Sequence, residues 1–535
     1  MLKVISLLLF LFSTMVQASP LDIIPVQHDG RIKPFKGYAA ESLQFIYGRA
    51  KYNKKPATEI IMTWMLAPEE WDNIKFMRVQ DKEIRESLKI DSNETLYSPK
   101  DLVGNEVFKL RLQEIATKSD NKEPLTSLED KLVQLDQKIA LYFGLRSGQL
   151  FNIYPQTMGF VPTDNNEKWI NAYNLKGDGL AGFKKLVTAF SGYVSGSKEK
   201  DLKAAVNDWI GLVKNKDNHD LIPWKQINAE LKLLNHKPFL WSWILYLLAA
   251  IFCLVLFLSD KKKTGLKKTT YATIGLALAL HIYGLLLRVY VTGRAPVTNM
   301  YETVVWVALV AVVFSLVFQM IKTRWLTLLS ACFTAAFCLI LTHLSPVVLD
   351  PKLSPLEPVL RDNFWLLTHV LIIVGSYAAF FVAFVLGDIM LATYLLKQKA
   401  YEKMAKDAAM SIYRCLQLGV VTLTAGTILG AIWADYSWGR FWAWDPKETW
   451  ALIGILGYLA LLHARLTGWA KDFGMAVGSV LAFSLIIMAW YGVNFVLGAG
   501  LHSYGFGAGG FGFVATFVAI HWVFVALVVW KKQAS

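Results

Sequence analysis

Residues 433–450 carry the most unusual chemistry in this sequence, because they read WADYSWGRFWAWDPKETW and hold five of the chain's 19 tryptophans. Tryptophan has a large, flat, apolar face, which gains free energy when it is buried against a planar apolar ligand. Trp438, Trp442 and Trp444 are the predicted binding surface. Tryptophan is also common where helices leave a membrane, but one or two per helix end suffice for that role. This tryptophan segment (residues 433–450) therefore predicts a platform for a large planar ligand.

Charged residues lie within the same segment. Arg440 and Lys447 are placed to pair with carboxylates on the rim of such a ligand. Asp445, Pro446 and Glu448 have the spacing of a helix start, with an N-cap, a first-turn proline and the second half of a capping box. We expect Asp445 and Glu448 to cap this helix rather than to act as catalytic acids. The N-terminus of this helix can also help to hold an anionic group of the ligand. Asp445, as part of this helix start, is counted with the ligand-binding residues of the segment.

Histidine supplies the metal-binding chemistry. A neutral imidazole ligates iron, and histidine inside a membrane helix is uncommon enough to indicate function. His369 lies near the start of an apolar run, His463 near the end of another, and His502 in the glycine-rich stretch 498–512, where backbone can approach a ligand closely. The six others are predicted to be structural or surface residues, with a hydrogen-bonded interior role for His281 and a reserve ligand role for His343: His28, His219, His236, His281, His343 and His521.

The composition defines the class of protein that must position these residues. The 535 residues are 54% hydrophobic and 18% charged, whereas charged residues make up about 25% of a typical soluble protein. The mean hydropathy of +0.37 excludes a disordered or fibrous chain. Four cysteines are too few for a disulfide scaffold, and the absence of CxxC and CxxCH argues against a dithiol centre and a c-type cytochrome.

Nine apolar segments predict the fold class, an all-α integral membrane protein with about nine transmembrane helices. The predicted spans are Phe239–Leu258, Thr270–Val291, Met300–Ile321, Leu326–Thr342, Phe364–Leu386, Leu416–Trp433, Thr449–Leu466, Met475–Leu497 and Phe511–Trp530.

The N-terminal part has a different pattern. Residues 1–18, with one lysine, an apolar core and a small residue at the end, predict a secretory signal peptide. Residues 19–237 hold no run long enough to span a membrane and predict an exported, mostly helical soluble domain, with helical spacing in Ser127–Phe143 and weaker spacing in Leu180–Val194. Residues 238–535 form the predicted membrane domain.

Charge predicts the orientation of that domain. Residues 238–535 carry 22 Lys/Arg and 12 Asp/Glu, and 16 of these basic residues fall in segments that lie inside if residue 237 lies outside, against six in the outer segments. Because basic residues favour the inner side, this excess reflects membrane topology, and we exclude nucleic acid as a partner. The orientation places the tryptophan segment, His369 and His502 on the outer side. Two histidines above an aromatic surface are what bis-histidine haem binding requires.

The tryptophan segment resembles the WWD signature of the haem-handling proteins of cytochrome c maturation. Among these, the chain most resembles the CcsA (ResC) family of system II, from about Leu276 to Phe511. Four further stretches carry the likeness: residues 295–302 (APVTNMYE), 363–369 (NFWLLTH), 463–467 (HARLT) and 500–506 (GLHSYGF). Residues 25–34 (PVQHDGRIKP) resemble, less specifically, the exported segment that precedes the CcsA part of some fused CcsBA proteins.

The resemblance implies roles for the site residues. His369 and His502 match the pair that ligates haem iron on the outer side, and His463 matches one of two ligands of a haem site within the membrane. The other ligand of that site comes from the partner subunit CcsB (ResB), and this chain has no evident CcsB half. Asn299 and Glu302, at the outer start of the third span, either line the outer cavity or serve the helix structurally.

The function implied is export or reception of haem b and its covalent attachment to the CxxCH cysteines of apocytochrome c, as the CcsA side of a cytochrome c synthase (haem lyase). The implied partners are CcsB/ResB, apocytochrome c and thiol-reducing proteins. The implied location is the bacterial inner membrane, with residues 19–237, the tryptophan segment and the His502 loop in the periplasm. The alternatives are a CcmC- or CcmF-like protein of system I, a haem transporter without ligation chemistry, and an electron-carrying membrane cytochrome.

Overall fold

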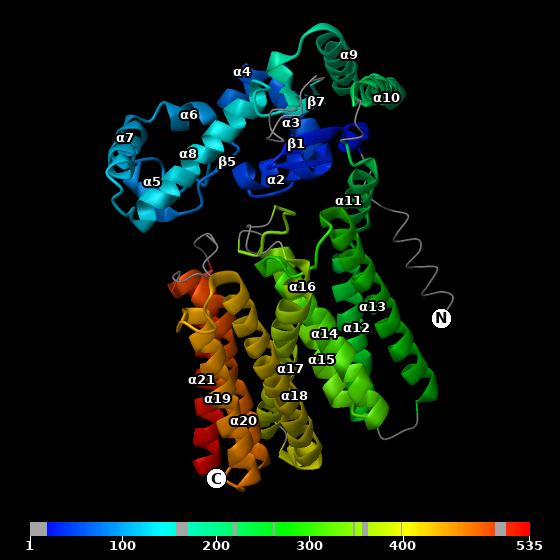
Figure 1. The fold of residues 1–535 in the computed structure, drawn as a ribbon, viewed down its shortest axis with the longest axis vertical. Helices are drawn as coiled ribbons and strands as arrows, with labels where there is room; N and C mark the ends of the chain where they lie inside the picture. Colours follow the sequence, from blue (N-terminus) through cyan, green and yellow to red (C-terminus); the bar gives the residue numbers. More distant parts are fainter. Residues whose placement is uncertain are drawn as a thin grey trace. The chain divides into compact units, whose positions relative to one another are not determined.

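The computed structural model describes residues 19–156, 169–217, 222–259, 263–345, 348–355, 362–396, 398–497 and 510–534. The chain divides into two compact units between His236 and Lys237. The predicted signal peptide and His502 lie outside the described residues. The helices of both units dominate the structure, which confirms the predicted all-α class (Figure 1).

The N-terminal unit also contains strands, which the sequence patterns did not indicate. Its largest sheet has the order β2-β1-β7-β8, with all neighbours antiparallel. Asp29 and Gly30 join β1 to β2 and both have positive φ, as a tight hairpin turn requires. The strands are β1 (Pro25–His28), β2 (Arg31–Pro34), β3 (Lys51–Tyr52), β4 (Lys55–Pro56), β5 (Met77–Arg78), β6 (Leu96–Tyr97), β7 (Asn152–Pro155) and β8 (Trp169–Asn171).

Helices make up most of the N-terminal unit. The predicted helices at Ser127–Phe143 and Leu180–Val194 are confirmed as α8 and α9. The helices are α2 (Phe35–Tyr47), α3 (Ala57–Leu66), α4 (Pro68–Asn73), α5 (Lys82–Ser87), α6 (Pro99–Val103), α7 (Glu106–Asp120), α8 (Ser127–Arg146), α9 (Gly177–Val194), α10 (Glu199–Lys216) and α11 (Trp224–His236), with short 3-10 turns at Pro20–Ile23 and Ala172–Asn174.

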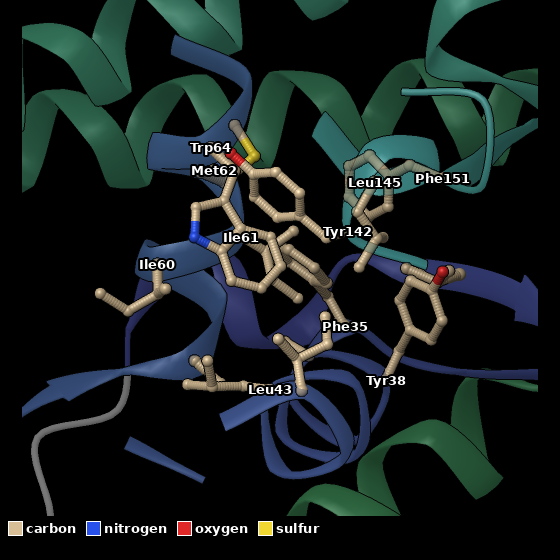
Figure 2. Close-up of a cluster of buried hydrophobic side chains, with 14 of the residues drawn as sticks. Phe35, Tyr38, Leu43, Ile60, Ile61, Met62, Trp64, Tyr142, Leu145 and Phe151 are labelled. Atoms are coloured by element: carbon tan, nitrogen blue, oxygen red, sulfur yellow. The ribbon is translucent and has the colours of Figure 1, made fainter. Parts of the chain in front are cut away.

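Large aromatic side chains fill the core of this unit. Trp64 of α3 meets Tyr142 of α8 edge to face, with ring centroids 5.2 Å apart, and both side chains are fully buried (Figure 2). Phe35, at the start of α2, lies in the same cluster. Aromatic rings bury more area than other side chains and prefer such tilted contacts, so this cluster joins α2, α3 and α8 into one core.

A buried ion pair fixes α11 to the β1–β2 hairpin. Arg31 of β2 donates two hydrogen bonds to the carboxylate of Glu230 on α11, at 2.6 and 3.0 Å. The side chains are 18% and 5% exposed. A two-pronged Arg–carboxylate pair is both strong and directional, so it sets the orientation of α11 within the unit.

Nine helices in the described part of the chain are long and apolar enough to span a membrane, as predicted. Most extend several residues beyond the predicted spans. They are α12 (Pro238–Leu258), α13 (Thr264–Thr292), α14 (Met300–Ile321), α15 (Trp325–Leu344), α17 (Leu371–Leu396) with α16 (Asn363–Trp365) and the π-helix η5 (Leu366–Val370) before it, α18 (Gln398–Trp438), α19 (Pro446–Leu466), α20 (Asp472–Ile487) with the π-helix η6 (Met488–Leu497) after it, and α21 (Phe511–Ala534).

Helix α17 lies at the centre of the membrane unit. It packs against α14, α18 and α20, while α12, α13 and α15 form one side of the unit and α19, α20 and α21 the other (Figure 1). The π-helix η5 lies at the start of α17, and the π-helix η6 lies at the end of α20. Each π turn inserts one residue into an α-helix, and such insertions occur most often at functional sites.

The Arg31–Glu230 pair gives a stability prediction. Arg31→Ala leaves the Glu230 carboxylate buried without its cation, and we expect the opening free energy of α11 to fall by about 3 kcal/mol. Hydrogen exchange of α11 amides in the full-length protein measures this loss. The matched control is Lys82→Ala, which breaks a pair whose side chains are 71% and 59% exposed, and whose loss should cost less than about 0.5 kcal/mol. Equal effects of the two variants would refute the assignment.

Candidate functional site

A cavity opens in the membrane unit where the first turns of α14 and α19 meet η5, α18 and η6. The centre of a water molecule can occupy about 190 Å³ of this cavity, which is partly open to its surroundings. Its wall is mainly apolar, with a small number of polar groups, which is the usual make-up of a ligand site. The lining includes Asn299, Met300, Thr303, His369, Tyr377, Thr427, Gly430, Trp433, Ser437, Trp438, Trp442, Lys447, Glu448, Trp490 and Asn494.

His369 enters the cavity from the π-helix η5. Its Nδ1 lies 2.8 Å from the carbonyl oxygen of Gly426 on α18. A carbonyl only accepts hydrogen bonds, so Nδ1 carries the proton, and Nε2 of the neutral ring carries the lone pair. Metal-ligating histidines are commonly oriented by such a bond from the other ring nitrogen. The His369 imidazole thus has the tautomer that an iron ligand needs.

Three tryptophans line the cavity beside His369: Trp433 and Trp438 of α18, and Trp442 of the following loop. The ring of Trp433 lies 5.7 Å from the His369 ring, nearly edge to face. Trp444 differs from the prediction, because it is not among the lining residues and is 69% exposed. Its backbone has a positive φ of 59°, and its ring meets the ring of the lining residue Trp442 edge to face at 5.9 Å.

The predicted charged residues separate into two groups. Lys447 lines the cavity. Arg440 does not: its guanidinium lies over the Trp438 ring at 5.4 Å and donates to Glu448 at 3.3 Å. Because Lys447 lines the cavity and Arg440 does not, Lys447 is the better placed group for an acidic ligand.

The predicted helix start is present at α19. Asp445 accepts from the Lys447 amide at 2.9 Å, and the reciprocal capping box with Glu448 is complete. The second oxygen of Glu448 also accepts from the Ala443 amide at 2.8 Å. One carboxylate therefore ties the end of the tryptophan segment to the first turn of α19, and Asp445 acts as a cap rather than as a cavity-lining residue.

The cavity lining also includes residues that the sequence patterns did not single out. Trp490 of η6 donates its indole N–H to the Thr303 hydroxyl at 3.1 Å. Asn494 donates to the Trp490 carbonyl at 2.6 Å and to the Met300 sulfur at 3.4 Å. The sequence carries no signal for these residues, because an α-to-π change leaves the apolar pattern of the helix unaltered.

A buried charge network supports the start of α14. Arg288 of α13 pairs with Glu302 at 2.8 Å, and the two side chains are only 3% and 2% exposed. The other Glu302 oxygen accepts from the amide and hydroxyl of Thr298 at 2.8 and 2.7 Å. Asn299 caps α14 by accepting the Glu302 amide at 2.8 Å. Asn299 thus lines the cavity and caps the helix, whereas Glu302 has the structural role alone.

The remaining histidines lie apart from this cavity. His463 is exposed on α19, with its Nδ1 2.8 Å from the Leu459 carbonyl. His281 is fully buried between the Tyr246 hydroxyl and the Val305 carbonyl, which agrees with the predicted interior role. His343 is exposed at the end of α15. His521 lies 3.5 Å from Asp388 on α17. Among the described residues, no group of three or more histidine, cysteine and acidic side chains forms a protein-only metal site.

Several known proteins are similar in sequence to parts of this chain. A family described as Cytochrome C assembly protein matches residues 297–502, a range that contains every lining residue of the cavity. The chain is 34% identical over 284 residues to the cytochrome c biogenesis protein CcsA of Synechococcus sp. (strain CC9311), covering 46% of this chain and 90% of that protein. It is 32% identical over 240 residues to CcsA of Chlamydomonas reinhardtii, covering 44% and 67%.

A longer relative is the protein NrfI of Wolinella succinogenes. It is 29% identical over 491 residues, which cover 89% of this chain but 53% of NrfI, so the chain spans about half the length of that relative. Because 89% of the chain exceeds the membrane unit, the similarity to NrfI includes part of the N-terminal unit as well.

The Glu448 carboxylate gives a second prediction. Glu448→Ala removes the acceptor for the Ala443 and Asp445 amides, and the loss of one cap, worth about 1 kcal/mol, should speed their hydrogen exchange about fivefold. Exchange measured by mass spectrometry on peptides covering residues 438–450 tests this. Glu448→Gln is the control, because its amide oxygen still accepts and the increase should be smaller. Unchanged exchange in Glu448→Ala would show that the segment is held by other contacts.

Proposed function

The chain belongs to the CcsA family of cytochrome c biogenesis proteins, and we propose that its cavity holds haem b by its iron through His369 and presents it for covalent attachment to apocytochrome c. Family membership establishes a role in cytochrome c maturation, which involves haem, and the nine apolar helices of the described residues make this a multi-pass membrane protein. The cavity supplies the more specific proposal.

One observation carries it: His369, with a lone pair on Nε2, shares a cavity with four tryptophans and one lysine. Haem is a planar macrocycle with an iron that takes imidazole and two carboxylates at one edge. The aromatic wall suits the ring, the imidazole suits the iron, and Lys447 suits a propionate.

The reaction then needs position more than protein chemistry. Each cysteine of the CxxCH segment adds its S–H across a haem vinyl group, so that sulfur bonds to one carbon, hydrogen to the other, and nothing leaves. The protein fixes the haem while its vinyl edge meets the peptide, and the cofactor supplies the reactivity. Both cysteines must be thiols, which is why thiol-reducing partners belong to the proposal.

Two further histidines complete the proposed haem sites. His502 is proposed as the second iron ligand on the outer side, and it lies outside the described residues. His463 is exposed on α19, so we propose that it contributes to a second haem site whose other ligand comes from a CcsB/ResB-type subunit. Its Nδ1 contact to Leu459 leaves Nε2 as the ligating nitrogen.

The proposed location is the bacterial inner membrane with the cavity on the periplasmic side. The charge distribution supports it, because the basic residues concentrate in the segments that would then face the cytoplasm. In this orientation the tryptophan segment and residues 19–237 face the compartment in which c-type cytochromes are assembled.

The ligand proposal is tested by spectroscopy of the purified full-length protein, alone and with a CcsB-type partner. His369→Ala and His502→Ala are each expected to abolish or alter the bis-histidine haem spectrum, because each removes one axial ligand. His463→Ala should change only the haem that depends on the partner. His343→Ala is the matched control, being exposed and remote from the lining. A wild-type spectrum in His369→Ala, or loss of haem in His343→Ala instead, would overturn the assignment.

The role of Lys447 is tested separately. Lys447→Gln keeps a polar side chain of similar length but loses the charge, so haem should dissociate about tenfold faster with its bis-histidine spectrum unchanged, as expected for loss of one charge-assisted bond of about 1.5 kcal/mol. Arg440→Gln is the comparison, because Arg440 is paired with Glu448, and a smaller effect is expected. A larger effect from Arg440→Gln would mean that arginine holds the ligand's carboxylate.

A further inference from the structure

One face of α18 borders the imidazole of His369. We propose that Gly430 on this face is a positioning residue for haem ligation. Gly426, Gly430 and Trp433 follow one another at intervals of four and three residues, so they share one face of the helix. The inference rests on the proposed function, because it concerns the side chain through which haem iron would be held.

Gly430 lies directly against the imidazole of His369. A Cβ atom at this position would lie 2.5 Å from Cε1, 2.9 Å from Nδ1 and 3.1 Å from Nε2 of His369. Ordinary Cβ contacts are longer than 3.0 Å, so an alanine requires the ring to turn or to withdraw. Since the three nearest atoms all belong to one ring, the missing side chain at 430 makes room for that ring specifically.

Gly426 has a different structural role, which is to allow close contact between α17 and α18. A Cβ there would lie 2.8 Å from Cβ and 2.9 Å from Cα of Ile373, so the backbones of α17 and α18 touch at this level. That close approach brings the Gly426 carbonyl within 2.8 Å of His369 Nδ1. A substitution at 426 would separate the helices, whereas one at 430 acts on the imidazole. Gly430 is therefore the position that isolates ligand orientation.

The third side of the ring is closed by Trp433, at 5.7 Å and an interplanar angle of 62°. The Gly426 carbonyl fixes the tautomer of His369, the missing side chain of Gly430 leaves space for the ring, and Trp433 limits its rotation. The orientation of an axial imidazole influences the electronic structure of haem iron, and misplacement by about 1 Å can cost 100-fold in rate. Gly430 thus acts through His369 and does not itself touch the haem iron.

The test compares full-length wild-type protein with Gly430→Ala, His369→Ala and Gly275→Ala. Gly275, within the membrane helix α13, is the matched control because its added Cβ would meet nothing within 4 Å. The readouts are the electron paramagnetic resonance spectrum of the ferric haem and the yield of thioether-linked cytochrome c. Gly430→Ala should shift the low-spin signal and lower the yield about tenfold or more, while Gly275→Ala should match the wild type.

A coupled variant keeps the proposal testable if Gly430→Ala accumulates poorly. His369→Gly with added imidazole provides an untethered ligand that can shift away from an alanine at 430. Adding Gly430→Ala to this background should then change haem binding less than twofold, which is the non-additivity expected of two groups in contact.

The outcomes separate the two ideas. If Gly430→Ala keeps the wild-type signal and yield while His369→Ala loses both, the positioning role is wrong and the proposed function stands. An equal impairment by Gly430→Ala with and without the His369 side chain also overturns the positioning role. If His369→Ala itself retains the wild-type spectrum, the proposed ligand fails, and the positioning inference fails with it.

Discussion

Polar groups around the cavity must find their partners within the protein, because apolar helices and lipid offer none. The π-helices η5 and η6 release backbone carbonyls from the regular helical pattern. The indole of Trp306 donates to the Leu371 carbonyl at 3.1 Å, and the amide of Asn494 donates to the Trp490 carbonyl. The same demand for partners fixes His369 against Gly426. The hydrogen bonds that make an irregular backbone tolerable in this environment are thus the ones that orient the cavity wall.

The buried charges follow the same rule. Arg288 and Glu302 are almost completely removed from solvent, and each unpaired ion would cost several kcal/mol in such a place. Glu302 satisfies both of its oxygens, one with Arg288 and the other with Thr298. The network holds the loop before α14, and with it Asn299, against the cavity. These buried charges therefore fix the backbone near the cavity, whereas Lys447 lines the cavity itself.

Much of the architecture could be predicted because its signals are local. Apolar length defined the nine spans, and Asp445, Pro446 and Glu448 defined the start of α19 through residue types at fixed spacing. The short strands of the N-terminal unit have four residues or fewer, too few for a clear alternation of apolar and polar side chains. The π-helices change the register by one residue without changing hydropathy, which is why Trp490 was missed.

The direction of individual side chains was also beyond the sequence. Trp444 is 69% exposed and has a positive φ, and residue type alone indicates neither for a tryptophan. Arg440 pairs with the carboxylate of Glu448, eight residues further along the chain. This pairing competes with a ligand for the arginine, and it depends on the path of the loop between the two residues. The aromatic character of the segment was predictable, but the division between its lining and exposed members depended on the folded backbone.

Helix α19 carries one residue of each of the two proposed haem sites. Lys447 lies at one end and His463 sixteen residues further, about 24 Å along the axis at the standard rise and on nearly the opposite face. Because the Glu448 carboxylate holds the loop to the first turn, Trp442 moves with that end. Because α19 is one continuous helix, a displacement of the His463 end would also act on Lys447 and on the loop at the other end.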